Sequence, residues 1–176
     1  MKKLVIFLPV LLFPTPIHAD ESAIDCLTKN IYFEAKNQSI AGQLAVALVV
    51  LNRVKDKRFP KTICAVIYEG PTYESWKTRQ IPDLPKESRK YYPRRDRCQF
   101  SWYCDGKSDT IPTPDQELYQ LITAMAFKIY YAGEGNDFTN GATHYHAHYV
   151  QPSWAQTKTK TVTIGDHIFY RWELLP

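Results

Sequence analysis

One carboxylate in this sequence is placed by helical spacing where it could do acid–base chemistry. Apolar residues recur at i, i+3, i+7 and i+11 and form one stripe of a helix: Ile24, Leu27, Ile31 and Ala35. Glu34 follows Leu27 and Ile31 at i+7 and i+3, so it lies at the edge of that stripe. Apolar surroundings disfavour the ionised form, which raises the pKa and suits Glu34 to act as a general acid. The alternative is an ion-paired or helix-end carboxylate without chemistry.

A second set of residues with possible chemistry is the alternating row His144, His146 and His148. In a strand all three would face the same side, because successive strand side chains alternate. Such a row suggests a zinc site in a metal-dependent enzyme. Alternating neighbours on one straight strand rarely converge on a single tetrahedral ion, however. We therefore favour substrate contact or packing for these histidines and predict no metal.

The first nineteen residues have the pattern of a secretory signal peptide. Lys2 and Lys3 give a positive start, residues 4–13 are apolar, and Ala19 is the small residue needed for cleavage. The apolar run is shorter than the roughly 20 residues of a membrane span, although an uncleaved anchor is the competing interpretation. We predict one domain over residues 20–176 that is periplasmic or secreted, with no stable membrane insertion. Removal of the two lysines lowers the formal net charge from +4 to +2, which indicates no particular partner.

Four cysteines follow the predicted signal: Cys26, Cys64, Cys98 and Cys104. An even number in an exported chain favours disulfides over free thiols, and three connectivities are possible. We favour Cys98–Cys104, which closes a small loop, together with Cys26–Cys64, which joins two helices. Zinc binding is the alternative, but there is no C-x-x-C pair and the spacings suit no common structural site.

Periodicity predicts helices in the first part of the chain. They are expected from about Ser22 to Lys36, over residues 40–54 after Ser39 as N-cap, and over about 61–68. The second is apolar nearly all round and should be the central buried helix. Five prolines and dense charge in residues 70–112 argue against regular elements there. A basic cluster in that region either contacts an anionic polymer or is a solvated loop face: Lys86, Arg89, Lys90, Arg94, Arg95 and Arg97.

The rest of the chain completes an α+β fold. Thr113 as N-cap, Pro114 at the first position and Gln116 predict a helix to about Ala132. Strand alternation follows, with a strand over 143–150 and a hairpin of 161–164 with 167–170 around Gly165-Asp166. We expect a mostly helical N-terminal part and a small antiparallel sheet near the C-terminus.

Several segments, in order, resemble the spore cortex-lytic type of bacterial cell wall hydrolase. Each is weak alone, but the ordered set covers nearly all of residues 20–176. The segments are Asn30–Lys36, Gly42-Gln43 with Ala45-Val46-Ala47, Val50–Val54, Phe59-Pro60, Val66-Ile67-Tyr68, Cys98–Ser101, Gly141–Ala147, Pro152-x-Trp154 and Ile164-Gly165-x-His167-x-Phe169.

This resemblance implies a lysozyme-like catalytic domain that acts on the glycan strand of peptidoglycan and is similar to lytic transglycosylases. The family's catalytic acid corresponds to Glu34. The usual Glu-Ala-Arg-Gly-Glu is here Glu34-Ala35-Lys36-Asn37-Gln38, so Gln38 replaces the second carboxylate. No second acidic residue stands in an obviously apolar setting in the sequence.

One acid can suffice for such a reaction. Glycosidases usually employ two carboxylates, whereas a lytic transglycosylase uses the sugar's own C6 hydroxyl as nucleophile. We expect cleavage between N-acetylmuramic acid and N-acetylglucosamine with a 1,6-anhydro product, and hydrolysis stays open because the placement of one water decides it. The candidate substrate contacts, each of which could instead serve packing or loop capping, are Gln99, Ser101, Tyr32, His144, His146 and Trp154.

Two other functions remain open. The histidine row would serve a metal-dependent N-acetylmuramoyl-L-alanine amidase, and a non-catalytic peptidoglycan-binding module would need no carboxylate on an apolar face. We expect a monomer that has peptidoglycan glycan strands as its partner, binds no nucleic acid and needs no cofactor.

Overall fold

The first helix is the hub of the helical part of the protein. The computed structural model describes residues 17–132 and 137–173, and helix α1 runs from Ile17 to Ala35. It begins earlier than the predicted Ser22, because no proline or glycine separates Pro16 from that serine. The first sixteen residues of the predicted signal peptide lie outside the described residues.

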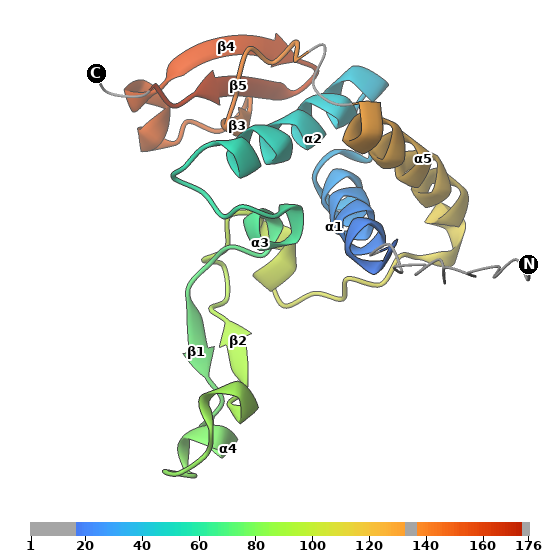
Figure 1. The fold of residues 1–176 in the computed structure, drawn as a ribbon. Helices are drawn as coiled ribbons and strands as arrows, with labels where there is room; N and C mark the ends of the chain where they lie inside the picture. Colours follow the sequence, from blue (N-terminus) through green and yellow to red (C-terminus); the bar gives the residue numbers. More distant parts are fainter. Residues whose placement is uncertain (1–16, 133–136, 174–176) are drawn as a thin grey trace, which may run out of the picture.

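Three helices pack around α1: α2 (Ile40–Lys55), α3 (Ile63–Ile67) and α5 (Gln116–Ala132), as Figure 1 shows. Leu27 and Ile31 are fully buried between them, which confirms the apolar stripe of α1. Among the described residues, no helix combines the length and the apolar character that crossing a membrane requires.

Helix α2 is buried on nearly all sides, as its apolar sequence predicts. It begins after Ser39, whose hydroxyl accepts a hydrogen bond from the backbone of Gly42 at 3.3 Å. Its valines lower the intrinsic helix propensity, so packing must stabilise it. One face contributes to the helical core and the other to a second core beneath the sheet: Ala47 and Val50 on the first, Ala45 and Val49 on the second.

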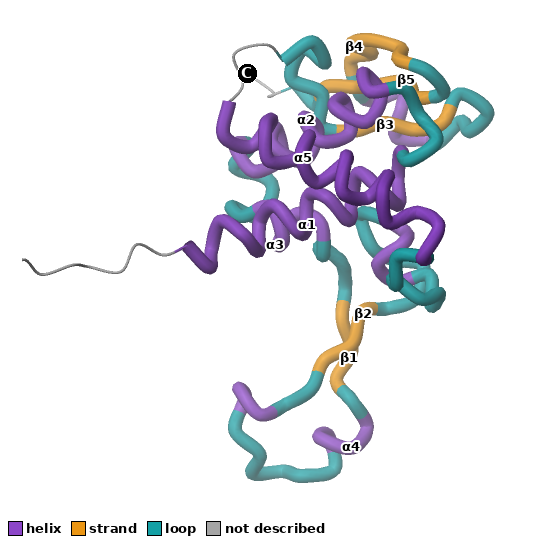
Figure 2. Tube along the Cα trace, turned by 90° about the vertical axis from the view of Figure 1, so that its right-hand side faces the viewer, coloured by secondary structure: helices purple, strands orange, loops and turns teal. Residues whose placement is uncertain are grey.

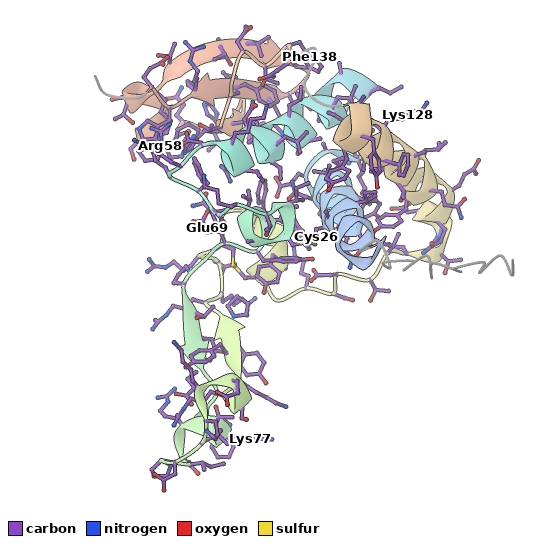
Figure 3. All side chains as sticks on the ribbon, in the orientation of Figure 1. Cys26, Arg58, Glu69, Lys77, Lys128 and Phe138 are labelled. Carbon is purple, nitrogen blue, oxygen red and sulfur yellow. A yellow bond between two sulfur atoms is a disulfide. The ribbon has the colours of Figure 1, made fainter. Side chains whose placement is uncertain are left out.

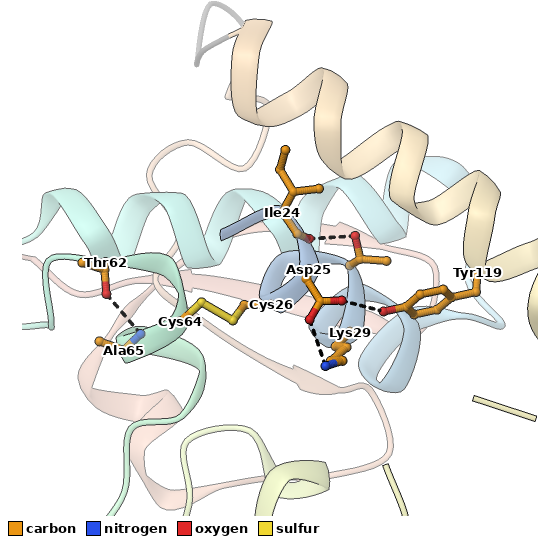
Figure 4. Close-up of a disulfide and its surroundings, with 9 residues drawn as sticks. Ile24, Asp25, Cys26, Lys29, Thr62, Cys64, Ala65 and Tyr119 are labelled. Carbon is orange, nitrogen blue, oxygen red and sulfur yellow. Dashed lines mark hydrogen bonds and ion pairs between the residues drawn. A yellow bond between two sulfur atoms is a disulfide. The ribbon is translucent and has the colours of Figure 1, made fainter. Parts of the chain in front are cut away.

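Both expected disulfides are present. Cys26–Cys64 joins α1 to α3 across a Cα–Cα distance of 5.4 Å (Figure 4). Cys98–Cys104 closes the expected small loop. Near the first bridge, the hydroxyl of Thr62 caps α3 by accepting from the backbone of Ala65 at 3.3 Å. The predicted connectivity is therefore confirmed.

The C-terminal sheet has three antiparallel strands in the order β3-β5-β4. They are β3 (His144–Ala147), β4 (Thr159–Ile164) and β5 (His167–Arg171). Strands β4 and β5 form the predicted hairpin, and Gly165 takes a positive φ of 56°, which glycine adopts without a side-chain clash. Strand β3 is shorter than the strand expected over 143–150. The backbone turns after Ala147, whose carbonyl accepts a hydrogen bond from the backbone N–H of Val150 at 2.9 Å.

Residues 71–97 form a projecting arm, where the sequence predicted no regular elements. Strand β1 (Thr72–Glu74) pairs antiparallel with β2 (Tyr91–Pro93), and the short helix α4 (Trp76–Arg79) lies beyond them. Figure 2 shows the arm standing away from the helices and the sheet. The proline density did not prevent pairing, because Pro93 lies at the end of β2 and the other arm prolines lie outside the strands.

The start of α5 also differs from the prediction. Thr113–Asp115 form a 3-10 turn, so Thr113 is not a side-chain cap. Gln116 instead donates from its amide to the carbonyl of Ile111 at 3.1 Å. The overall architecture is nevertheless the predicted one: α+β, mainly helical, with a small antiparallel sheet near the C-terminus.

Candidate active site

Glu34 lies in the last turn of α1, half-buried, opposite strand β3. The hydroxyl of Tyr145 donates a hydrogen bond to its Oε2 at 2.8 Å. Burial raises the pKa of Glu34 above the usual glutamate range, while the Tyr145 hydrogen bond and the charge of Arg53 oppose that rise. Burial has the larger effect, so Glu34 keeps its proton to higher pH than a free glutamate does. That is the property required of a general acid.

Sequence reasoning named Tyr145 only as part of a motif and not as a site residue. Burial, and then the neighbouring Glu34, raise the pKa of Tyr145 well above its ordinary value. The phenol therefore stays protonated and always donates to the carboxyl group. Strand alternation contained the signal, because Tyr145 lies between His144 and His146 and must face the other side of the sheet.

Arg53 is a buried cation beside Glu34 and Tyr145, and its own contacts hold it in place. Its Nε donates to the carbonyl of Thr143 at 2.7 Å, and its guanidinium lies over the rings of Phe59 and Phe100 at 5.2 and 5.1 Å. Burial lowers the pKa of Arg53, and its Nη1 has no hydrogen-bond partner among the described residues. Electrostatic attraction links it to Glu69, and to Glu34 when that carboxyl group is ionised.

Asn52, the residue before Arg53, binds the same segment of chain, which leads into β3. Asn52 donates to the carbonyl of Ala142 and to the Asp137 carboxylate, both at 3.0 Å. Together Asn52 and Arg53 tie α2 to the residues that lead into β3. This is how the Asn-Arg pair of the sequence motif positions Tyr145 opposite Glu34.

Glu69 is a half-buried carboxylate that the sequence did not single out. Its Oε2 is buried and has no hydrogen-bond partner in the described part of the chain. Arg53 interacts electrostatically with both Glu69 and Glu34. The backbone carbonyl of Glu69 accepts from the backbone of Gln99 at 3.0 Å. In the sequence Glu69 follows the helix expected over about 61–68, and no pattern marks its carboxyl group.

Gln99 and Ser101 lie on the loop closed by Cys98–Cys104, and both are exposed. Trp102 anchors that loop to α1: its indole donates to Asn30 Oδ1 at 3.0 Å, and its ring stacks on Phe33 at 4.8 Å. Because α1 also carries Glu34, this anchor fixes the loop to the same helix. The two polar side chains are thus free to meet a ligand, which keeps them as proposed substrate contacts.

Tyr32 does not fit the predicted substrate contact. Its side chain is only 1% exposed, and its hydroxyl hydrogen-bonds Asp115 while it accepts from Lys36 at 3.1 Å. It therefore links α1 to the start of α5, and we assign it to the core.

The predicted histidine row is split. The register of β3 and β5 puts His144 and His146 on the sheet face opposite Tyr145, where they pack against Trp154 at 5.2 and 5.6 Å. Burial, helped by nearby cations, lowers the pKa of His144 to about 3 and keeps it neutral. His148 lies outside the strand. Within residues 17–132 and 137–173, no three His, Cys, Asp or Glu side chains are grouped to hold a metal. The expected contacts of His144, His146 and Trp154 with a substrate at Glu34 find no support in this arrangement.

The ordered motifs and this geometry agree with the result of a family comparison. Residues 37–170 match the model of the family described as Cell Wall Hydrolase. The chain belongs to the cell wall hydrolase family. The matched region begins just after Glu34, so the assignment of that residue rests on its setting in the structure and on the motif around it.

Solved structures of similar chains are known. The catalytic domain of the germination-specific lytic transglycosylase SleB from Bacillus anthracis superposes with a TM-score of 0.56 at 25% identity, covering 89% of this cell wall hydrolase and 100% of that chain. The catalytic domain of the Bacillus cereus SleB protein gives the same TM-score and identity, covering 89% and 95%.

Curated relatives match over a shorter region. The spore cortex-lytic enzyme of Bacillus cereus is 34% identical over 70 residues, which is 40% of this chain and 27% of that protein. The enzyme of the same name from Bacillus subtilis is 33% identical over 67 residues, or 38% and 22%. The match thus spans about a quarter of the length of these relatives.

Proposed function

We propose that this cell wall hydrolase cleaves the bond between N-acetylmuramic acid and N-acetylglucosamine in peptidoglycan, as a lytic transglycosylase with Glu34 as its acid. The observation that carries the proposal is the half-buried Glu34 carboxyl, whose pKa is raised by burial and which is held by Tyr145 at 2.8 Å. Family membership and the likeness to SleB catalytic domains support the same class of chemistry.

The reaction needs one proton donor that later becomes an acceptor. Glu34 gives its proton to the glycosidic oxygen as the bond from that oxygen to C1 of N-acetylmuramic acid breaks. The C6 hydroxyl of the same sugar then attacks C1, and its proton passes to the Glu34 carboxylate. Glu34 ends protonated as it began, no water is consumed, and the product carries a 1,6-anhydro ring.

Tyr145 positions the acid for both steps. Its hydroxyl occupies Oε2, which leaves Oε1 as the oxygen available to the substrate. The same hydrogen bond favours the carboxylate once the proton has left. The Tyr145 phenol therefore assists proton release, while burial keeps the resting acid protonated.

Glu69 offers the one alternative that a specific observation favours. A hydrolase needs a second carboxylate to activate a water, and Glu69, whose Oε2 is buried, shares Arg53 with Glu34. Glu69→Gln separates the two outcomes. The single-acid reaction retains activity within about tenfold, whereas loss as large as that of Glu34→Gln would assign the hydrolytic mechanism.

The decisive experiment compares purified sacculi treated with wild-type protein and with Glu34→Gln in EDTA buffer. Lysis by the wild type alone would support a metal-independent enzyme that acts through Glu34. Full dependence on an added metal would favour an amidase. Wild-type binding without release of fragments would favour a non-catalytic module.

We also propose that the protein works outside the cytoplasm, in the periplasm or secreted, as a monomer that starts at Asp20. The signal-like sequence of residues 1–19 and two disulfides support this location. N-terminal sequencing of the exported protein tests the cleavage site. A protein in the membrane fraction that still begins with Lys2 and Lys3 would indicate an uncleaved anchor. Analytical ultracentrifugation tests the monomer.

A further inference from the structure

The arm ends in a segment that lies far from the body of the protein, which consists of the helices and the C-terminal sheet. Glu74 and Tyr91 are the last cross-strand pair of β1 and β2, so residues 75–90 form the far end, here called the tip. The backbone N–H of Ser75 donates to the carbonyl of Lys90 at 2.7 Å, directly beyond that pair. Figure 3 shows Lys77 at this end and Glu69 where the arm leaves the body.

Polar contacts hold the tip in shape. Ser75 and Thr78 are buried, and the hydroxyl of Thr78 donates to the carbonyl of Ser75 at 3.2 Å. Arg89 forms an ion pair with Glu74 at 2.8 Å and donates to the carbonyl of Leu84 at 3.1 Å. No residue of the tip belongs to either apolar core of the described chain. The interior of the tip is therefore polar, and its other side chains are presented at defined positions.

Two large apolar side chains lie on the outside of the tip. Trp76 in α4 is 62% exposed, and Ile81, two residues after that helix, is 49% exposed. Single exposed apolar residues are common on protein surfaces. Here, however, both lie at the end of a projecting element with a polar interior, which is the reverse of the arrangement in the body. The tip therefore gains free energy from a partner that removes these side chains from water.

The tip is also the more positive part of the arm. Residues 75–90 contain five Lys and Arg against two Asp and Glu, a net charge of +3, whereas residues 91–97 carry +2. Residues 20–176 as a whole carry +2, so everything outside the tip carries −1. Lys77, Lys86 and Lys90 are exposed and take part in no ion pair within the described residues. An anionic partner is thus attracted to the tip in particular.

Tyrosine rings lie on the two strands directly behind the tip. Tyr73 and Tyr92 are cross-strand neighbours with ring centroids 6.1 Å apart, and both are nearly half exposed. Tyr91, at the start of β2, is 49% exposed. Tyrosine and tryptophan favour the boundary between water and lipid, because an apolar ring carries a polar hydroxyl or N–H group.

We propose that the tip docks reversibly on an anionic lipid surface. In this arrangement Trp76 and Ile81 enter the head-group region, and the three exposed lysines of the tip lie among the lipid phosphates. The tyrosines of β1 and β2 then lie at the level of the head groups. This is adsorption at the surface and not the insertion of a spanning segment.

The exposed apolar pair favours lipid over a dissolved anionic polymer. Both kinds of partner attract the lysines of the tip. Only a lipid surface also offers an apolar phase to the aliphatic side chain of Ile81, and interfacial binding grows with both the buried apolar area and the attraction to anionic lipids. The proposal goes beyond glycan cleavage and does not depend on it.

The first test measures co-sedimentation with vesicles of phosphatidylglycerol and phosphatidylcholine at low salt. The tip variant and a control that removes three exposed lysines of the body have the same net charge: K77Q/K86Q/K90Q and K57Q/K128Q/K160Q. We expect the tip variant to bind about 100-fold more weakly than the control, since each lysine near an anionic surface contributes about fivefold. On vesicles of phosphatidylcholine alone the two should bind equally weakly. Equal binding to the anionic vesicles would overturn the proposal.

The second test concerns the apolar pair. W76S/I81S should bind the same anionic vesicles about tenfold more weakly than I40S/L121S, which changes two exposed apolar residues of the body. Brominated lipids should quench part of the tryptophan fluorescence of the wild type, and W76F should lose that quenching. If W76S/I81S binds like its control and lipid quenches no fluorescence, while the tip lysines still hold the protein on purified sacculi, the partner is an anionic polymer and the proposal fails.

A third variant guards against misfolding of the substituted tip. Replacing residues 75–90 by Asn-Gly joins the cross-strand partners Glu74 and Tyr91 through a two-residue hairpin turn. It should lose vesicle binding as K77Q/K86Q/K90Q does, and wild-type binding by this variant would refute the role of the tip. Glycan cleavage is measured alongside: failure of the wild type to cleave any glycan would refute the proposed function and leave the vesicle result standing.

Discussion

The body and the arm are held together in different ways. In the body, contacts between distant parts of the chain place the chemistry: Asn52 and Arg53 of α2 hold the approach to β3, and Tyr145 of β3 reaches Glu34 of α1. In the arm, Arg89 bonds residues within fifteen positions of itself in the sequence. From this difference we expect that the arm can change, or be removed, without disturbing the positions of the reacting groups.

The largest effect is expected at the centre of the body. Glu34→Gln should lower the rate of glycan cleavage by about 10³-fold, because it removes the only proposed proton donor. Turbidity loss of sacculi measures it, with Glu117→Gln, an exposed glutamate on α5, as the matched control. Activity within tenfold of the wild type would remove Glu34 from the mechanism.

The same variant should be more stable than the wild type at neutral pH. Burial raises the folded-state pKa of Glu34, so stability falls as pH rises from the unfolded value through the folded value. Glutamine has no such titration and should gain about 1 kcal/mol in the free energy of unfolding at pH 7. Urea denaturation at pH 4 and pH 7 checks this, since the difference between the two proteins should be smaller at pH 4.

Removal of the disulfide within the body should lower the free energy of unfolding more than removal of the disulfide at the base of the arm. Serine substitution of Cys26 and Cys64, which are 38 residues apart, should lower the free energy of unfolding by about 4 kcal/mol on the loop-entropy relation. Substitution of Cys98 and Cys104, 6 residues apart, should cost about 2 kcal/mol. Chemical denaturation under non-reducing conditions measures both, and a larger loss for the second pair would mean that the arm base supports the body.

Tyr145→Phe should have a moderate effect with a distinctive pH signature. Loss of one hydrogen bond to the carboxylate should lower kcat/KM by about tenfold. Because that bond lowers the pKa of Glu34, its removal raises the pKa further. The acid must be protonated to react, so the alkaline limb of the kcat/KM profile should move to higher pH. Tyr149→Phe, which changes an exposed tyrosine, should leave the limb in place.

The smallest effect is expected from the arm on small substrates. K90Q/R94Q/R97Q should cleave short soluble glycan fragments without stem peptides at a rate within about twofold of the wild type. Its exposed side chains touch none of the groups that hold Glu34. A loss above tenfold in kcat on these fragments would mean that the arm contributes to the reaction at Glu34. That result would contradict the view that arm and body act separately.

Patterns of spacing and residue type in the sequence predicted several features of the helices, the sheet and the disulfides. The stripe around Leu27 and Ile31 placed Glu34, two-residue alternation with Gly165-Asp166 predicted the hairpin, and an even cysteine count predicted disulfides. Three misses share a cause, which is that they depend on which distant segments meet. Tyr32 was expected at a substrate but hydrogen-bonds Asp115, the buried Oε2 of Glu69 has no local signal in the sequence, and Tyr145 acquires its role only when β3 meets α1.

The arm was missed for a different reason. Its strands are three residues each, too short for alternation to stand out against dense charge and proline. The histidine row shows the opposite error, because alternation was read correctly but the face it selects is turned away from Glu34. Strand periodicity says which residues share a face, and only the packed structure says which face meets the helices.

The most direct test of the account is the mass of the fragments that the wild-type protein releases from sacculi. Single-acid cleavage through Glu34 predicts 1,6-anhydro muropeptides, each lighter by one water than the hydrolysis product, and none from Glu34→Gln. Fragments uniformly heavier by that water, with free reducing ends, would contradict the account and direct attention to Glu69 and an activated water.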